Sequence, residues 1–198
     1  WIQEGFAVYS EALYIEHKLG YNVMIDFLLK KRQGIKNNLP IVGPVNENYW
    51  AFGDSYNKGA WVLHTLRNAI NNDDLWFSTL KKFAVDNAKS HVSTETFLNY
   101  IIKATEKNYQ LVFYQYFYDH RPPTFEYNQQ GQTFYYRWSN VISGFAMPVD
   151  IDLNGVEKRL EVSEKLSSIN ITEHSVIHIR DWESLIITKR NPDIKKLN

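Results

Sequence analysis

The chain has 198 residues, and its 22 Lys and Arg residues balance its 22 Asp and Glu residues, so its formal net charge is zero. A neutral chain offers no bulk field that would recruit nucleic acid or an anionic membrane surface. It has no Cys, which excludes disulfides, thiolate metal ligands and cysteine nucleophiles, and no apolar run approaches the ~20 residues that span a bilayer. We therefore expect a globular protein with neither a nucleic-acid partner nor a membrane span.

The first two-thirds of the chain predicts helices. Residues 4–19 contain no Pro and end before Gly20, and residues 21–31 place apolar side chains at helical spacing. A loop rich in Gly, Pro and Asn follows from Gly34 to Gly53. Further helices are expected at 54–71, 73–83, 93–102 and 111–118, with Asp54 and Ser93 as capping residues.

After Pro123 the apolar pattern changes from helical spacing to alternation. Asn154-Gly155 is typical of a two-residue hairpin turn, so we predict a hairpin there. Strands are expected at 134–138, 149–153, 156–162, 169–171, 176–179 and 185–188. Together these elements predict an α+β chain, with a helical unit over residues 1–120 and a small antiparallel β-sandwich over residues 123–190.

The first predicted helix has an unusual charge pattern. Glu4 and Glu11 are its only charged residues before Glu16, and no Lys or Arg precedes Lys18. Seven residues make almost two turns, so both carboxylates share one face with apolar neighbours, which favours their burial. A buried carboxylate must be paired, protonated or bound to a metal. From spacing alone, two structural salt bridges are the simpler interpretation, and a metal site is the alternative.

The same segment resembles a known family. Residues 1–11 are Trp-Ile-Gln-Glu-Gly-Phe-Ala-Val-Tyr-Ser-Glu, similar to the W-x-N-E-G-F-A-x-Y-x-E segment of the gluzincin zinc aminopeptidases, which include the membrane alanyl aminopeptidases and the leukotriene hydrolase. The resemblance implies that Glu4 is the third zinc ligand, after an HExxH helix that supplies two His ligands and a general base. Gln3 replaces the usual Asn. Glu11 matches the family's second acid, which implies a role in supporting a ligand.

A second segment agrees with the first in order and context. Residues 53–60 are Gly-Asp-Ser-Tyr-Asn-Lys-Gly-Ala, similar to the family's x-Y-x-K-G-A/F helix start. The resemblance implies that Tyr56 donates a hydrogen bond to the oxyanion of the tetrahedral intermediate, while Lys58 and Gly59 belong to the scaffold. The first turn of a helix suits developing negative charge, because free N–H groups and the positive dipole end lie there. Weaker similarity covers residues 113–123 and 145–149.

The motif that should precede these segments is missing. The six His residues are never arranged as HExxH, and the family's G-x-M-E-N motif is also absent. A catalytic zinc takes three protein ligands and a water, and this chain offers one of the three. The resemblance therefore implies a C-terminal fragment of a thermolysin-like catalytic domain followed by a β-sandwich. Its partners would be a peptide substrate and the upstream part of the same polypeptide. We expect zinc in the intact protein, with none bound and no activity in this fragment alone.

Other motifs have structural interpretations. Residues 150–161 fit the calcium-loop pattern with Asp150, Asp152, Asn154 and Glu161, but the alternation on both sides favours a hairpin. Asn170-Ile171-Thr172 is a glycosylation sequon, which arises easily by chance. We interpret His64 as a hydrogen-bonded core residue. The aromatic run 113–118 is expected to pack against neighbouring elements rather than to stack on bases.

The favoured function is zinc-dependent peptide hydrolysis, most simply the removal of amino-terminal residues. One alternative is a catalytically inactive relative that serves as a protein-interaction scaffold. Another is a free-standing β-sandwich binding module with a helical companion. An intact HExxH upstream would favour the peptidase, and a degenerate one would favour the scaffold.

Overall fold

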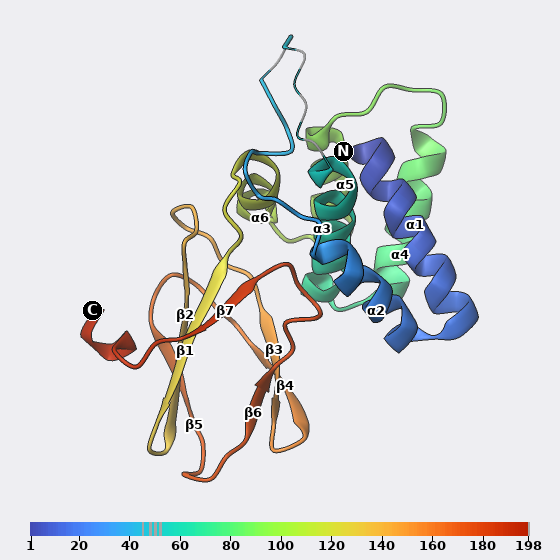
Figure 1. Ribbon diagram of the computed structural model, residues 1–198. Coiled ribbons are helices and arrows are strands. Elements are labelled where there is room, and N and C mark those ends of the chain that lie inside the picture. The colour runs from blue at the N-terminus through green and yellow to red at the C-terminus, as the bar shows by residue number, and fades with distance from the viewer. Residues whose placement is uncertain (45, 48, 50, 52, 198) are drawn as a thin grey trace. The chain divides into compact units, whose positions relative to one another are not determined.

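The computed structural model describes residues 1–44, 46, 47, 49, 51 and 53–197. The chain divides into two compact units, Trp1–His120 and Arg121–Asn198. The first unit is built from helices and the second mainly from strands (Figure 1). The α+β class predicted from the sequence is therefore confirmed.

The helical unit follows the predicted order of helices. Its elements are α1 (Ile2–Leu19), α2 (Tyr21–Arg32), α3 (Asp54–Ile70), α4 (Asp73–Asp86), α5 (Thr94–Thr105), α6 (Gln110–Phe113) and η1 (Tyr114–Tyr118). Ser93 caps α5 as predicted, and its side chain accepts a hydrogen bond from the Thr96 N–H in a reciprocal capping box. The predicted last helix is divided, because α6 passes directly into the π-helical turn η1.

Asp54 does not cap α3, contrary to the prediction. Gly53 takes the capping position, and Asp54 is the first residue of the helix. The Asp54 carboxylate accepts hydrogen bonds from the backbone N–H groups of Lys36 and Asn37 instead, each at 2.8 Å. Those two loop amides lie outside any helix or strand, so they offer the carboxylate donors that the helix start would otherwise supply.

Helix α3 lies at the centre of the helical unit. Trp61, Leu63 and Leu66 on this helix are fully buried, so a continuous apolar surface faces the surrounding helices. The backbones of α1 and α3 meet at Gly5 and Gly59, where a Cβ on either glycine would lie 3.0 Å from backbone atoms of the other. Only glycine permits this approach, so the two positions set the crossing of α1 over α3.

Aromatic side chains fill the space around the start of α1. The rings of Trp1 and Phe117 stack with centroids 4.1 Å apart, and Phe97 contacts Trp1 edge-on. Phe113 packs against both Phe97 and Phe117. The interpretation of the aromatic run as packing is confirmed for these buried residues.

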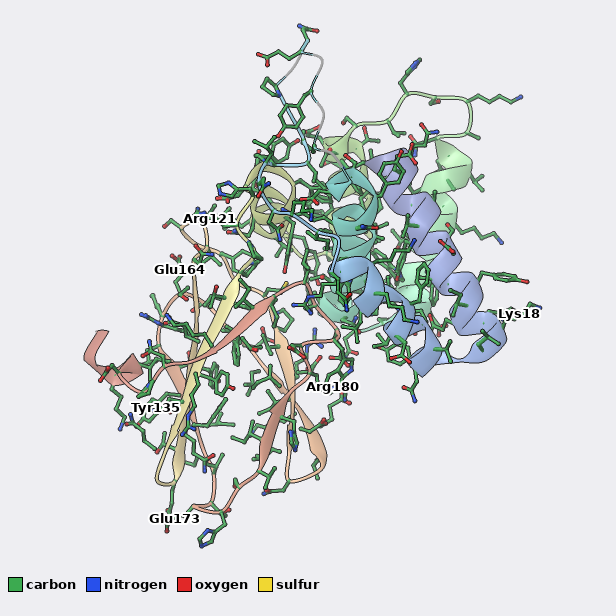
Figure 2. All side chains as sticks on the ribbon, in the orientation of Figure 1. Lys18, Arg121, Tyr135, Glu164, Glu173 and Arg180 are labelled. Atoms are coloured by element: carbon green, nitrogen blue, oxygen red, sulfur yellow. The ribbon has the colours of Figure 1, made fainter. Side chains whose placement is uncertain are left out.

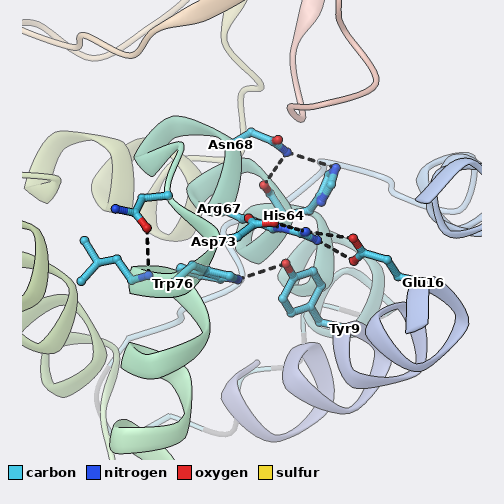
Figure 3. A network of polar contacts seen from close by, with 9 residues as sticks. Tyr9, Glu16, His64, Arg67, Asn68, Asp73 and Trp76 are labelled. Atoms are coloured by element: carbon cyan, nitrogen blue, oxygen red, sulfur yellow. Dashed lines mark hydrogen bonds and ion pairs between the residues drawn. The ribbon is translucent and has the colours of Figure 1, made fainter. Parts of the chain in front are cut away.

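A polar network joins three helices of the same unit (Figure 3). Arg67 of α3 donates two hydrogen bonds to Glu16 of α1 and two to Asp73 of α4, at 2.6–2.9 Å. Beside it, the Trp76 indole N–H donates to the Tyr9 hydroxyl at 3.2 Å. Both carboxylates are held bidentately by one guanidinium, the geometry in which Arg binds carboxylates most strongly.

The second unit contains a four-stranded and a three-stranded sheet, with strand orders β5-β2-β1-β7 and β4-β3-β6. The strands are β1 (Thr124–Gln130), β2 (Thr133–Ser139), β3 (Val149–Leu153), β4 (Val156–Leu160), β5 (Ser167–Asn170), β6 (Ile177–Ile179) and β7 (Ile187–Arg190), followed by the turn η2 (Ile194–Leu197). Along β2, Phe134, Tyr136 and Trp138 are buried. Tyr135 points to the opposite face, where the Lys195 ammonium lies over its ring (Figure 2). This is the alternation expected of a half-buried strand.

Three features of these sheets differ from the prediction. β1 was not expected, because it carries the polar residues Glu126 and Asn128 at buried positions, which removes the apolar alternation that indicates a strand. Glu126 is paired there with Arg137 and Lys189. The four-stranded sheet is also mixed rather than antiparallel, because β7 enters it parallel to β1. β7 begins two residues later than predicted, after the buried Leu185 and Ile186.

The predicted hairpin at Asn154-Gly155 is confirmed. Both residues have positive φ, 54° and 80°, as a type I′ turn requires, and β3 pairs with β4 across the turn. The calcium-loop alternative is wrong, because Asp150 lies in a strand and pairs with Arg159 at 2.7 Å. Among the described residues, no three His, Cys, Asp or Glu side chains are grouped to hold a metal. None of the described helices is long and apolar enough to cross a membrane.

Candidate functional site

A pocket of about 330 Å³ lies where the N-terminal ends of α1 and α3 meet the loop after α2. Helix α1 contributes Glu4, helix α3 contributes Tyr56, and the loop supplies most of the remaining wall. The lining residues are Trp1, Glu4, Ile41, Gly43, Pro44, Glu47, Tyr49, Ala51, Ser55 and Tyr56. The two residues that the sequence motifs single out separately, Glu4 and Tyr56, therefore line one pocket.

The contact between Gly5 and Gly59 brings these two residues together. Glu4 immediately precedes Gly5 on α1, and Tyr56 lies about one helical turn before Gly59 on α3. The two helices approach backbone to backbone at the glycines. The side chains of Glu4 and Tyr56, which lie nearer the helix starts than the glycines do, therefore reach the same space. Gly5 and Gly59 thus position Glu4 and Tyr56 in one pocket.

The charge of Glu4 acts directly on Tyr56. It is the largest cause that raises the pKa of the Tyr56 hydroxyl, followed by desolvation and by a hydrogen bond between the hydroxyl and the Glu4 carboxylate. A negative neighbour disfavours tyrosinate, so Tyr56 remains a phenol throughout the neutral range. Its ring is about one-third exposed (36%), so the hydroxyl is available both to Glu4 and to a bound molecule.

Glu11 lies outside this pocket, and the expectation that it is buried is wrong. Its side chain is 56% exposed and forms an ion pair with Lys31 of α2, with 3.9 Å between the charged atoms. At this level of α1 the neighbouring helix is α2, which offers a lysine in place of an apolar surface. For Glu11 the salt-bridge interpretation is the one that the geometry supports. Its suggested role in supporting a ligand stays a prediction.

Lys58 and His64, also on α3, are fully buried. The Lys58 ammonium lies 3.4 and 3.5 Å from the backbone carbonyl oxygens of Asp119 and His120. Burial lowers its pKa to about 8, although the negative charges of Asp54 and Asp119 act to raise it. The Nε2 atom of His64 lies 3.2 Å from the Asn68 side-chain amide, and the imidazole contacts the Trp61 ring. Both are core residues, which agrees with the scaffold interpretation of Lys58 and confirms the core interpretation of His64.

Sequence reasoning missed the loop wall of the pocket. Residues 34–53 were predicted only as a loop, and residues 45, 48, 50 and 52 lie outside the described part of the chain. Ile41, Gly43, Glu47 and Tyr49 nevertheless line the pocket, and the Tyr49 hydroxyl donates to the Pro40 carbonyl at 2.6 Å. The available signal was a loop of unusual length for a compact unit, since such loops often carry function.

Glu4 and Glu47 are the carboxylates among the described residues that line the pocket. A carboxylate oxygen is an ordinary zinc ligand, and Glu4 faces the pocket beside Tyr56. The described residues bring no group of three possible ligands together.

Comparison with known proteins identifies the fold. No family model and no curated protein matches the chain. The structure is similar to that of Legionella pneumophila aminopeptidase A in complex with aspartic acid, with a TM-score of 0.72 and 16% sequence identity. The match covers 95% of this chain and 24% of the other, so this chain spans about a quarter of that protein. At this identity the similarity establishes the fold alone: the chain has the fold of a segment of an aminopeptidase.

Proposed function

We propose that this chain is part of a zinc-dependent peptidase that removes amino-terminal residues from peptides. The observation that carries the proposal is the pairing of Glu4 with Tyr56 in one pocket. The aminopeptidase-like fold supports it, as does the similarity of the segments around both residues to the gluzincin motifs.

Glu4 would be one zinc ligand, and the two histidines would come from a part of the polypeptide outside this chain. Zinc bound there would polarise the scissile carbonyl and lower the pKa of its bound water. Because this chain supplies a single ligand, we expect the isolated chain to bind zinc no tighter than about micromolar. Isothermal titration calorimetry tests this expectation, and sub-micromolar binding would contradict it.

Tyr56 would stabilise the oxyanion. Its raised pKa keeps the proton on the phenol, so the hydroxyl can donate a hydrogen bond as negative charge develops on the substrate oxygen. In the free pocket the hydroxyl is beside the Glu4 carboxylate, and rotation of the hydroxyl would direct its proton to the substrate. The position of Tyr56 in the first turn of α3 adds the favourable end of the helix dipole.

The charge of the pocket favours a cationic group of the substrate. Glu47 lines it beside the proposed zinc ligand Glu4 and would supply the negative charge, and none of the described lining side chains is Lys, Arg or His. An α-ammonium group is the cation that every peptide amino terminus presents near neutral pH, with a pKa of about 8. The pocket thus suits an amino-terminal residue better than the interior of a peptide chain.

The decisive experiment is Tyr56→Phe in the intact protein that contains this chain, assayed with aminoacyl p-nitroanilides. Loss of one oxyanion donor should lower kcat about 10²–10³-fold. Tyr14→Phe is the control, because Tyr14 is 64% exposed on α1 and should leave turnover unchanged. Equal turnover in Tyr56→Phe and the parent would remove Tyr56 from the mechanism. An intact protein with neither zinc nor turnover would favour the scaffold alternative.

A further inference from the structure

Asp54 is a buried carboxylate with an unusual set of partners. It is 2% exposed, and its two carboxylate oxygens accept hydrogen bonds from the backbone N–H groups of Lys36 and Asn37, each at 2.8 Å. Hydrogen bonds to an ionised acceptor are stronger than those between neutral groups. One side chain therefore attaches two successive loop residues to the first turn of α3.

The loop that begins at this attachment forms the wall of the candidate site. Ile41, Gly43, Glu47 and Tyr49 follow Asn37 along the chain, and all four line the pocket that contains Glu4 and Tyr56. A second attachment lies further on, where the Val42 N–H donates to the Phe117 carbonyl at 3.0 Å. Both attachments hold the loop to the helical unit, but only the first joins it to the helix of Tyr56.

A buried cation lies beside Asp54 in the scaffold. Lys58, one turn further along α3, is fully buried, and its charge interacts with that of Asp54. The start of a helix also favours a negative charge. An oppositely charged neighbour and two amide donors compensate for the burial of the carboxylate. Among the described residues, the printed partners of the Asp54 carboxylate belong to the scaffold, while its backbone N–H donates to the carbonyl of the pocket residue Ala51 at 3.2 Å.

We propose that Asp54 is a positioning residue, which fixes the loop wall of the pocket in register with Tyr56. The catalytic consequence rests on the proposed function, whereas the attachment itself does not. A purely stabilising role makes a different prediction. Loss of Asp54 would then lower the stability of the whole helical unit, and the exchange of the loop amides would change no more than that of the other amides of the unit.

Amide hydrogen exchange tests the attachment directly. In the wild-type chain, the Lys36 and Asn37 amides should exchange slowly although they lie in irregular structure. Asp54→Asn keeps the size of the side chain but leaves one acceptor oxygen, so we expect at least one of the two amides to exchange about tenfold faster or more, with the amides of Leu63 and Leu66 still protected. Asp74→Asn is the control, because Asp74 is an exposed acid in the first turn of α4.

Rapid exchange of both amides in the wild type would overturn the proposal, as would unchanged exchange in Asp54→Asn. If Asp54→Asn fails to fold, Asp54→Ser keeps one acceptor oxygen without the amide donors. Exchange of the Lys36 and Asn37 amides in the wild type and in Asp54→Ser then decides whether Asp54 holds the loop.

Kinetics in the intact protein tests the effect on the pocket. A displaced loop wall should raise KM for aminoacyl p-nitroanilides at least severalfold with a smaller change in kcat, whereas Tyr56→Phe should mainly lower kcat. Unchanged KM in a folded Asp54→Asn variant would overturn the positioning role. If the wild-type protein hydrolyses no peptide, the proposed function fails, and the exchange measurements still decide whether Asp54 holds the loop.

Discussion

A Cβ on Gly59 would lie 3.0 Å from the Cα atom of Gly5, so helices α1 and α3 touch backbone to backbone. That contact determines how far apart Glu4 and Tyr56 lie, because each belongs to the first turn of one of these helices. The geometry of the candidate site therefore depends on two residues that take no part in its chemistry.

Gly59→Ala should destabilise the helical unit although alanine favours helices. Separating two packed backbones costs about 1–3 kcal/mol, while the gain in helix propensity is about 1 kcal/mol. We therefore expect the free energy of unfolding, measured in urea, to fall by up to about 2 kcal/mol. Gly53→Ala is the control, because a Cβ at Gly53 has no neighbour within 4 Å and φ there is −75°. A more stable Gly59→Ala variant would show that the helices separate freely.

Glu4→Gln should lower the pKa of the Tyr56 hydroxyl. The charge of Glu4 is the largest cause of its raised value, and glutamine removes that charge while keeping a similar shape. The Tyr56 ring carbon bonded to the hydroxyl, followed by NMR during a pH titration, reports the change. Glu11→Gln should have no effect, since Glu11 pairs with Lys31 outside the pocket. An unchanged Tyr56 pKa in Glu4→Gln would contradict the direct interaction.

Arg67→Met should destabilise the helical unit strongly. Methionine keeps much of the apolar stem but leaves Glu16 and Asp73 without the guanidinium that binds both. Breaking a buried ion pair costs about 3–5 kcal/mol. Because Asp73 is 56% exposed, we expect a smaller effect here: the free energy of unfolding, measured in urea, should fall by about 2–4 kcal/mol. Lys82→Met, which removes an exposed pair with Asp86 on α4, is the control and should change stability far less.

Glu183 should make the second unit less stable as the pH rises. Burial raises its pKa to about 7 from 4.5, with Asp150 adding to the effect and Arg180 opposing it. Since the folded state holds this proton more tightly, the stabilisation is full below about pH 4.5 and is lost as the pH passes 7. The free energy of unfolding, measured in urea, should fall by about 1–2 kcal/mol between pH 5 and pH 8.

Glu183→Gln should remove most of that loss, whereas the exposed control Glu173→Gln should keep it. A parent unit whose stability is constant between pH 5 and 8 would show that Arg180, which lies 2.6 Å from the Glu183 carboxylate, outweighs the burial.

Local signals in the sequence predicted most of the secondary structure. The Asn154-Gly155 turn and the Ser93 cap were both found from short-range patterns, because each depends on a few neighbouring residues. β1 escaped the same approach, since its buried Glu126 is compensated by Arg137 and Lys189 from other strands. A local pattern cannot contain a partner that is distant in the chain.

The same distinction holds for the candidate site. Glu4 and Tyr56 were each identified from a short motif, yet nothing in either motif states that they share a pocket. Glu11 has the helical spacing that favours burial, but its side chain is 56% exposed and pairs with Lys31 of α2. Asp54 likewise has the sequence position of a cap, and the nearby loop amides of Lys36 and Asn37 take its carboxylate instead.

By itself, therefore, the sequence determined the α+β class, the order of the elements and the two residues on which the proposed chemistry rests. Only the tertiary structure decided that these residues meet, which loop encloses them and which acids are buried. The physical reason is that helix starts and turns depend on neighbouring residues, whereas burial, ion pairing and the approach of Gly5 to Gly59 depend on residues that belong to other elements of the fold.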